Sequence, residues 1–404
     1  MNRVVVTGLG VISPVGQSAP EYWSALIAGR SGLAPPSAEL APHVSTKLLG
    51  QVRDFDPAAH FEPSQVAVLD RVSQFAVVAA RQALAQSGLS LDGELSERTA
   101  VIVGTGSGGH TTVDESFHRL YAEGAKRLHP LTIPKAMISA PASQISMFCR
   151  ARGPSFAISS ACASATHAIG QAFHLVRSGG ATCALSGGTE ASITPGALKG
   201  WEAMRIMAPD ACRPFSRDRK GMVIAEGAAV LVLETLENAR QRGAEILAEL
   251  VGFGMSADAR DLTAPDSGGM ARAISSALAD ASLAPDMIDY VNAHGTGTVA
   301  NDEAETNALH ASFRDHAMRL AVSSTKSMVG HSLGAAGALE FVAAVMALHD
   351  GIIPPTVNYL DADPACDLDY VPNEARRRPI GGALSNSFAF GGLNAVLAAR
   401  RFMG

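Results

Sequence analysis

The chain has 404 residues, of which 47% are hydrophobic and 17% charged, and this composition excludes a chain that is disordered throughout. Lys and Arg number 32 against 38 Asp and Glu, so the net charge is −6, and the absence of any basic run argues against nucleic-acid binding. The cysteines number 5 and include no CxxC pair, so we expect neither a disulfide framework nor a zinc site.

Strand and helix patterns alternate from one end of the chain to the other. Short β-branched runs predict strands at 3–7, 99–104, 155–160, 182–187, 228–234, 247–253, 288–293, 320–323, 382–386 and 394–399. Helical periodicity falls between them, at 69–87, 162–178, 234–243, 270–281, 302–312 and 334–349. This alternation predicts an α/β architecture. A strand followed by small residues occurs at both 155–178 and 382–399, which indicates two related halves meeting near residue 250.

The best candidate for a membrane-spanning segment lies at 333–348, but Glu340 interrupts it. We therefore expect no membrane insertion, and the cysteine usage makes a reducing cytoplasm the expected location.

Cys162 lies where a predicted strand gives way to a predicted helix, among small residues that read SSACASA. The free N–H groups of a helix N-terminus stabilise a thiolate, and they can also bind the oxyanion of an acyl transfer. The other interpretation is a small buried core residue, which is the commoner position of a free cysteine. Local sequence alone leaves the two open.

Two histidines lie at junctions between predicted elements. His294 ends the strand IDYVNA and enters the loop GTGT, while His331 lies between Gly330 and Ser332, five residues after Lys326. Polar residues in glycine-rich loops are more often functional than those on a helix face. No pair of candidate ligands has the spacing of a metal-binding helix, so we expect no metal site of that kind.

Two further motifs suggest other functions. The segment 104–109 matches GxGxxG, but no return strand ending in an acidic residue follows it, which argues against a dinucleotide site. The segment 330–334, GHSLG, matches the nucleophile elbow of α/β-hydrolases, with Ser332 as its nucleophile. The only later histidine is His349, on the same predicted helix, so a serine hydrolase stays the second hypothesis.

Four separated motifs, taken in order, resemble a known family. They read SSACASATHAIG, NAHGTGTVANDEAET, SSTKSMVGHSLGAAGALE and SNSFAFGGLNA, and they are similar to the elongating β-ketoacyl-acyl-carrier-protein synthases of the thiolase superfamily, the condensing enzymes of type II fatty-acid synthesis. The resemblance covers the whole chain. It implies a thiolase-like, five-layered αβαβα fold built from two similar halves, which we place at 1–250 and 251–404, and a homodimer.

The resemblance also implies a reaction: a decarboxylative Claisen condensation between an acyl primer on Cys162 and malonyl-carrier protein, giving 3-oxoacyl-carrier protein, CO₂ and free carrier. His294 and His331 would promote the decarboxylation. Lys326 would hold this array in place, with Glu305 as its partner. The other implied site residues supply the oxyanion hole (the N–H groups of Cys162 and Phe390), the gate (Phe388 and Phe390), the contacts to pantetheine (Thr296 and Thr298) and the acyl pocket (Ser107, Thr132 and Trp201).

The implied partners are acyl-carrier protein and malonyl-carrier protein. The enzyme would need no cofactor of its own, because phosphopantetheine arrives on the carrier. The resemblance allows a structural monovalent cation near Asn292, Glu340 and Asn386. The condensation would serve either fatty-acid synthesis or a specialised lipid or polyketide pathway. A non-catalytic chain-length partner of a synthase dimer is the third hypothesis, which the presence of Cys162 and both histidines opposes.

The sequence departs from the family pattern in three places. The gate has Ala389 and Leu393 where relatives usually carry Gly and Thr, which bears on gate mobility. Ser107 and Thr132 replace bulky apolar residues, which suggests a deeper acyl pocket. The stretch before the helix at 69–87 has only one basic residue, Arg71. Either the partner is a dedicated carrier protein, or docking rests on other basic residues, namely Lys199, Arg205 and Arg213.

Overall fold

A computed structural model describes residues 1–404, and its strands hydrogen-bond in one mixed sheet of 10 strands. Their order across the sheet is β3-β2-β4-β5-β1-β6-β12-β11-β7-β8. The strands are β1 (Val4–Ile12), β2 (Thr99–Gly104), β3 (Ser155–Ile158), β4 (Cys183–Glu190), β5 (Gly227–Thr235), β6 (Ala248–Ala257), β7 (Tyr290–Asn292), β8 (Ala321–Ser323), β11 (Gly382–Ala389) and β12 (Leu393–Arg400). A separate short pair joins β9 (Ile352–Ile353) to β10 (Arg376–Arg377).

The strand order repeats on either side of the contact between β1 and β6. Outward from β1 the strands are β5, β4, β2 and β3, and outward from β6 they are β12, β11, β7 and β8. Each series starts with two antiparallel pairings and ends with two parallel ones. This repetition confirms the predicted two similar halves. The boundary at residue 250 stays a prediction and lies inside β6.

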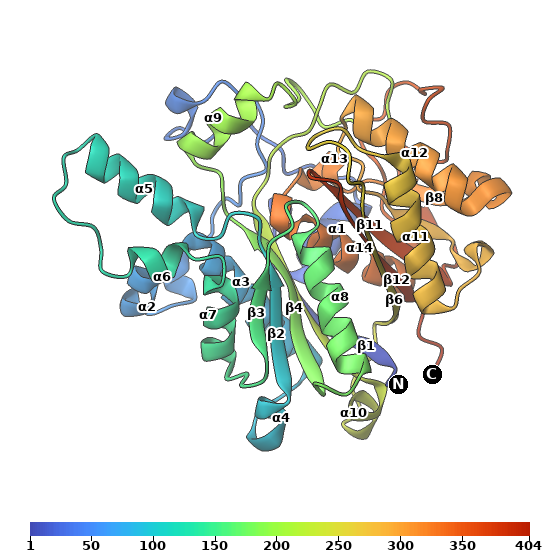
Figure 1. The fold of residues 1–404 in the computed structure, drawn as a ribbon, viewed down its shortest axis with the longest axis horizontal. Helices are drawn as coiled ribbons and strands as arrows, with labels where there is room; N and C mark the ends of the chain where they lie inside the picture. The colour runs from blue at the N-terminus through green and yellow to red at the C-terminus, as the bar shows by residue number, and fades with distance from the viewer.

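Helices cover both faces of each half and give five layers (Figure 1). On the outside of the first half lie α3 (Arg71–Ser87) and α7 (Ala140–Cys149); on the outside of the second lie α11 (Ser267–Ala281) and α12 (Val299–Phe313). Between the halves lie α8 (Ser164–Arg177) and α14 (Ala336–Asp350). The remaining helices are α1 (Ala19–Ile27), α2 (Pro63–Val68), α4 (Gly93–Glu97), α5 (His110–Tyr121), α6 (Thr132–Ala136), α9 (Pro195–Ala203), α10 (Leu236–Gln241) and α13 (Lys326–Val329).

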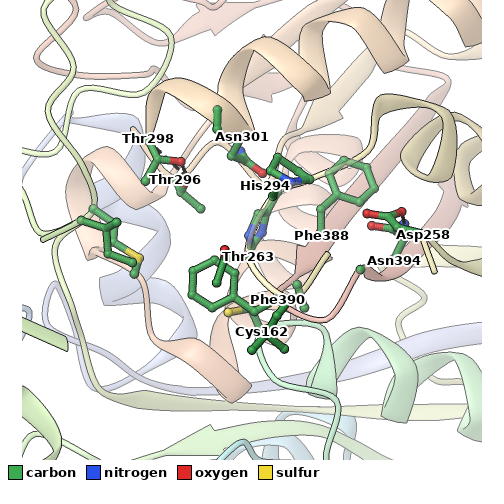
Figure 2. A pocket seen from close by; sticks show the side chains of 18 of the residues that line it. Cys162, Asp258, Thr263, His294, Thr296, Thr298, Asn301, Phe388, Phe390 and Asn394 are labelled. Carbon is green, nitrogen blue, oxygen red and sulfur yellow. Dashed lines mark hydrogen bonds between the residues drawn. The ribbon is translucent and has the colours of Figure 1, made fainter. Parts of the chain in front are cut away.

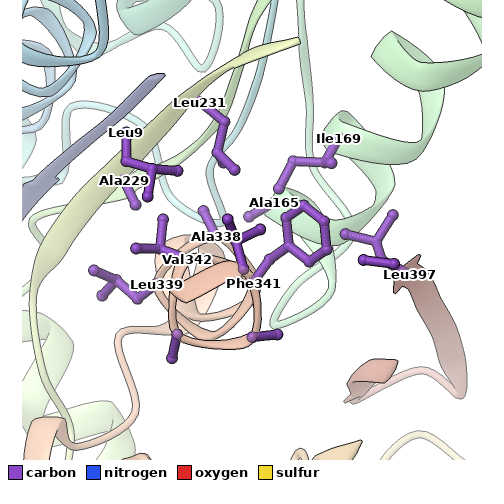
Figure 3. Packing of buried hydrophobic residues seen from close by; sticks show 14 of the residues in the cluster. Leu9, Ala165, Ile169, Ala229, Leu231, Ala338, Leu339, Phe341, Val342 and Leu397 are labelled. Atoms are coloured by element: carbon purple, nitrogen blue, oxygen red, sulfur yellow. The ribbon is translucent and has the colours of Figure 1, made fainter. Parts of the chain in front are cut away.

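The central helix α14 is apolar on nearly all sides, as a helix buried within a core must be. Figure 3 shows its residues Ala338, Phe341 and Val342 among side chains from both halves of the sheet. A Cβ on Gly337 would lie 2.0 Å from Thr166 Oγ1, so only glycine allows α8 to approach this closely. Residues 333–350 are long and apolar enough to cross a membrane, but 83% of that stretch is buried inside the protein.

The structure adds elements that the sequence pattern did not predict. β1 continues through Gly8 and Gly10 to Ile12, instead of ending at residue 7, because these glycines make room for α3: a Cβ on Gly10 would lie 1.8 Å from Ala79 O. Among the helices not predicted, α5 buries only Thr112 and projects from the body (Figure 1), and its apolar residues Phe117 and Tyr121 stay exposed.

Candidate active site

Cys162 is presented by a tight turn between β3 and α8. Ala161 has a φ of +50°, a left-handed conformation that side chains rarely adopt, and Ser164 Oγ closes the turn by accepting from Ser160 N at 2.9 Å. α8 begins at Ser164, so Cys162 stands just before the N-terminus of a helix, as the sequence predicts. Only 7% of Cys162 is exposed.

The second half of the chain supplies both histidines. His331 Nε2 lies 3.0 Å from Cys162 Sγ. The rings of His294 and His331 have their centroids 5.3 Å apart and stand nearly perpendicular, at 84°. Lys326 Nζ donates to His294 O at 2.5 Å and lies 3.2 Å from His294 Nδ1. The structure thus brings the four predicted catalytic residues together at one buried point.

The predicted partner of Lys326 is wrong. Lys326 Nζ forms its ion pair with Glu340, which projects from α14, and both side chains are buried. Glu305 instead accepts hydrogen bonds from the backbone N–H groups of His294 at 2.9 Å and Gly295 at 2.8 Å, and from Asn386 Nδ2 at 3.1 Å. Glu305 therefore fixes the backbone at His294, while Glu340 balances the charge of Lys326.

Burial controls the protonation of the site. It raises the pKa of Cys162 to about 12, although Lys326 opposes the change, so burial outweighs the helix end that the sequence suggested would lower this pKa. Burial, together with Lys326, holds the pKa of both His294 and His331 well below the usual value. At neutral pH the thiol is therefore protonated and both imidazoles are neutral. Nδ1 of His331 has no hydrogen-bond partner, so no neighbour fixes its tautomer.

A cavity of about 550 Å³ leads from Cys162 to the surface. Figure 2 shows Cys162, His294 and Phe390 near one another in this cavity. Thr296 and Thr298 lie on one side of them, and Asp258 and Asn394 lie on the other. Phe388 and Phe390 belong to the β11–β12 hairpin, in which Ala389 pairs with Leu393. The gate and pantetheine residues that the resemblance implies all line this cavity.

The three residues assigned to the acyl pocket do not line it. Trp201 stacks on Phe390, with ring centroids 6.3 Å apart. The N–H of Ser107 donates to Glu190 at 3.2 Å, in a loop that follows β2. Thr132 Oγ1 donates to His129 O at 2.8 Å at the start of α6, which lies beside α5.

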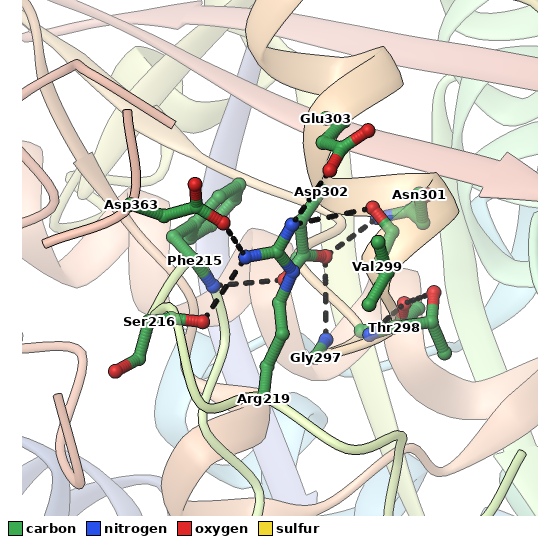
Figure 4. Close-up of polar contacts among 12 residues, drawn as sticks. Phe215, Ser216, Arg219, Gly297, Thr298, Val299, Asn301, Asp302, Glu303 and Asp363 are labelled. Atoms are coloured by element: carbon green, nitrogen blue, oxygen red, sulfur yellow. Dashed lines mark hydrogen bonds and ion pairs between the residues drawn. The ribbon is translucent and has the colours of Figure 1, made fainter. Parts of the chain in front are cut away.

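A buried arginine that the sequence does not predict supports the cavity wall formed by Thr296 and Thr298, the threonine wall. Arg219 has 1% of its side chain exposed and forms ion pairs with Asp363, Glu303 and, at 3.7 Å, Asp302 (Figure 4). Asp302 in turn accepts from Phe215 N at 2.8 Å and Gly297 N at 3.3 Å, so the network fastens the loop that carries Thr296 and Thr298. Because its members are scattered from residue 215 to 363, no local motif could reveal it.

A group of buried oxygens near Lys326 lacks hydrogen donors. Asn292 Oδ1, Asn386 Oδ1 and Glu340 Oε2 have no partner. Asn292 pairs in register with Ser385, next to Asn386, and α14 packs on both of these strands. Amide and carboxylate oxygens are ligands of hard cations, so these residues fit the monovalent cation that the resemblance implies.

The geometry opposes a serine hydrolase. Ser332 precedes α14 and His349 lies near its far end, and this helix of 15 residues is about 22 Å long. His349 instead forms ion pairs with Asp350 and Glu245 at the surface.

Known proteins match the chain along its whole length. The family model "Beta-ketoacyl synthase, N-terminal domain" matches residues 1–239, and "Beta-ketoacyl synthase, C-terminal domain" matches 247–360. Nodulation protein E of Rhizobium sp. (strain N33) is 48% identical over 99% of each chain. The 3-oxoacyl-[acyl-carrier-protein] synthase 2 of Coxiella burnetii (strain RSA 493 / Nine Mile phase I) is 43% identical over 99% of this chain and 98% of its own.

Among solved structures, a type II PKS ketosynthase in complex with its acyl-carrier protein has a TM-score of 0.89 and 32% identity, and the match covers 99% of this chain and 100% of that one. Fold, cysteine-histidine geometry and relatives agree with the resemblance noted in the sequence. The chain belongs to the β-ketoacyl synthase family.

Proposed function

We propose that this chain condenses a Cys162-bound acyl primer with malonyl-carrier protein to give 3-oxoacyl-carrier protein, CO₂ and free carrier. The observation that carries the proposal is the contact of 3.0 Å between Cys162 Sγ and His331 Nε2, next to a second neutral imidazole in a buried cavity. A nucleophile beside a base suits acyl transfer, and two imidazoles suit a developing enolate.

The first step moves the acyl group from the carrier's thioester to Cys162. Because the thiol is protonated, it needs a proton acceptor, and His331 Nε2 is in place to take this proton. Sγ attacks the thioester carbonyl, the carbon–sulfur bond to pantetheine breaks, and His331 returns the proton to the leaving thiolate. The backbone N–H groups of Cys162 and Phe390 would stabilise the oxyanion.

The second step forms the carbon–carbon bond. Malonyl-pantetheine enters along the cavity wall of Thr296 and Thr298, and loss of CO₂ leaves an enolate on its thioester oxygen. The Nε2–H group of His294 stabilises this charge, and so does that of His331 once its proton has moved from Nδ1, which has no partner, to Nε2. The enolate carbon attacks the acyl group on Cys162 and the carbon–sulfur bond to Sγ breaks. The released thiolate takes the Nε2 proton of His331, whose Nδ1 regains one from water, and the resting thiol is restored.

Because Ser107 and Thr132 do not line the cavity of about 550 Å³, an acyl chain that reaches them would have to extend beyond that cavity. Ser107 and Thr132 are small, and we infer that they leave room for an acyl chain longer or bulkier than a medium-chain primer. Ala389 and Leu393 pair across the gate hairpin and pack against the core, which limits the freedom of Phe390. Primer profiles of the wild type and Ser107→Ile test this point, and an unchanged preference for ordinary medium-chain primers would overturn it.

The carrier protein docks, we infer, beside exposed Arg205. Of the basic residues that the sequence offers, Lys199 pairs with Glu202, and Arg213 pairs with Asp210 and Asp218. Arg71 binds Glu226 through two hydrogen bonds. Arg205 is exposed and has no ion pair, so its charge is free for an acidic partner.

A second copy of the chain is the proposed partner subunit. β3 is an edge strand of the sheet, and exposed apolar side chains follow one another over the packed elements α5, α6, α7 and β3: Phe117, Tyr121, Leu131, Ile133, Met137, Ile138, Met147 and Phe156. Edge strands and large apolar surfaces are commonly covered by a partner. Sedimentation of the purified chain should show a dimer; a monomer would contradict the proposal.

Mass spectrometry after incubation with acyl-carrier protein tests the function directly. We expect one acyl group on the peptide that contains Cys162, lost in Cys162→Ala and kept in Cys149→Ala, a buried cysteine outside the cavity. Acylation of Ser332 would establish the hydrolase, and no adduct would favour a non-catalytic partner. Cys162→Gln should still decarboxylate malonyl-carrier protein; if it does not, the division of roles between cysteine and histidines is wrong.

A further inference from the structure

Glu190, the last residue of β4, is a buried carboxylate that the mechanism above does not use. It has no solvent exposure, and no charged side chain is among the groups that stabilise its anion. Its oxygens accept hydrogen bonds from three backbone N–H groups, those of Gly106 at 2.7 Å, Ser107 at 3.2 Å and Gly334 at 3.1 Å. A buried carboxylate without a cation is costly, so its retention needs a reason.

The three N–H groups come from two loops, one that follows β2 and one that follows His331. Gly106 and Ser107 follow β2 and lie alongside the start of α8, where a Cβ on Gly104 would come within 2.3 Å of Ala165 N. Gly334 follows His331 by three residues and belongs to a short 3₁₀ helix, Leu333–Ala335. One carboxylate therefore joins the side of Cys162 to the side of His331.

The two loops are in direct contact through Glu190. A Cβ on Gly334 would lie 2.2 Å from Gly106 N and 2.6 Å from Glu190 Oε2. Next to it, Leu333 is held at a φ of +48°, a conformation that persists only when its surroundings impose it. The hydrogen bond from Gly334 N to Glu190 is such a constraint. The space beside Gly334 is too small for any side chain at that position.

We propose that Glu190 is a positioning residue of the condensation, whose carboxylate sets the distance between Cys162 and His331 by holding the loops 104–107 and 331–334 together. The inference rests on the proposed function of the same site. Burial raises the pKa of Glu190 to about 7, so above that pH its charge also acts on the thiol. Together with burial it raises the pKa of Cys162, so the thiol stays protonated until His331 accepts its proton.

The test compares Glu190→Gln and Glu190→Asp with a matched control at the other end of the same strand pair. Glu190 pairs with Gly227 and Glu234 pairs with Cys183 in the β4–β5 ladder, and both carboxylates have no exposure. Glu234→Gln thus removes an equally buried carboxylate away from the site. The measurements are kcat and KM for malonyl-carrier protein, and the rate of iodoacetamide alkylation of Cys162 against pH.

We expect Glu190→Gln and Glu190→Asp to lower kcat about tenfold or more, since small misplacements of reacting groups cost that much. KM should stay unchanged, because the Arg219 network holds the threonine wall independently. The pH midpoint of alkylation should fall in Glu190→Gln, which loses the negative charge, and stay in Glu190→Asp, which keeps it. Glu234→Gln should alter only the unfolding temperature.

Wild-type kcat in Glu190→Asp, or an equal loss of kcat in Glu234→Gln, would overturn the inference; if Glu190→Gln does not fold, Glu190→Asp and the control still decide it. Failure of the proposed function would show differently, because the wild type itself would then carry no acyl group on Cys162.

Discussion

Replacing His331 by alanine tests whether burial or the helix end governs the pKa of the Cys162 thiol. The thiol of Cys162 has a pKa of about 12. At pH 8 such a thiol is ionised in about one molecule in 10⁴. Without the imidazole of His331, whose Nε2 lies 3.0 Å from Sγ, attack depends on that small ionised fraction. The rate of Cys162 acylation at pH 8 should therefore fall about 10³- to 10⁴-fold in His331→Ala.

The pH profile is the sharper part of this experiment. In His331→Ala the acylation rate should rise about tenfold per pH unit up to pH 10 without a plateau, because each unit multiplies the thiolate tenfold. In the wild type the acylation rate should stay constant with pH, including below pH 6.5. Burial keeps the pKa of His331 low, so the imidazole remains a proton acceptor there. Single-turnover acylation, followed by mass spectrometry from pH 5 to 10, measures both profiles.

A variant that reaches a plateau near pH 7 would refute this reasoning. It would show that the N-terminus of α8 ionises the thiol despite its burial. His349→Ala, which removes a surface histidine at the far end of α14, is the control and should match the wild type.

Three other outcomes follow from buried charges and close packing. Glu340→Gln leaves Lys326 as an unpaired buried charge and should lower the free energy of unfolding by about 3–5 kcal/mol in urea titrations. The double variant Lys326→Met/Glu340→Leu should lose less unfolding free energy than the sum of its two single changes. Additive losses would contradict the pairing. Gly337→Ala places a Cβ 2.0 Å from Thr166 Oγ1 and should destabilise by about 1–3 kcal/mol, with Gly243→Ala, at a site that has open space but a φ of +67°, as a comparison for backbone strain alone. Burial raises the pKa of Glu305 to about 7, so its contribution to stability is full below its unfolded pKa and is lost as the pH rises to 7. Glu305→Gln should therefore reduce the fall in unfolding free energy between pH 4.5 and 7, by up to about 1.4 kcal/mol per pH unit. An unchanged slope would count against a raised pKa.

Local signals in the sequence predict the α/β alternation and mark the candidate residues, whereas the five layers and the catalytic roles follow from the resemblance of four ordered motifs. Strand runs alternate with periodic helices, and Cys162, His294 and His331 each occupy a loop among small residues that can be recognised by itself. The partner of Lys326 could not be predicted in this way. Glu305 and Glu340 are both acidic residues on helices, and only the rotation of α14 within the middle layer decides which carboxylate reaches the ammonium group.

The protonation of the site needed the structure for a similar reason. A cysteine before a helix suggests a low pKa, but its actual pKa depends on how completely the two halves exclude water. The roles of Arg219 and Glu190 depend on contacts between segments more than 80 residues apart, for example from Ser107 to Glu190 and from Arg219 to Asp302. Such contacts leave no periodicity in the chain.

The repeated strand order gives the catalytic pair a particular origin within the fold. Cys162 follows β3 and precedes α8; His331 follows β8 and precedes α14, and β3 and β8 are the corresponding outermost strands of the two halves. Nucleophile and base thus occupy equivalent positions in the two halves, and their contact joins one half to the other. Because each half supplies one member, neither half can form the reactive pair alone. A small rotation of one half against the other would change the distance from Sγ to Nε2 directly.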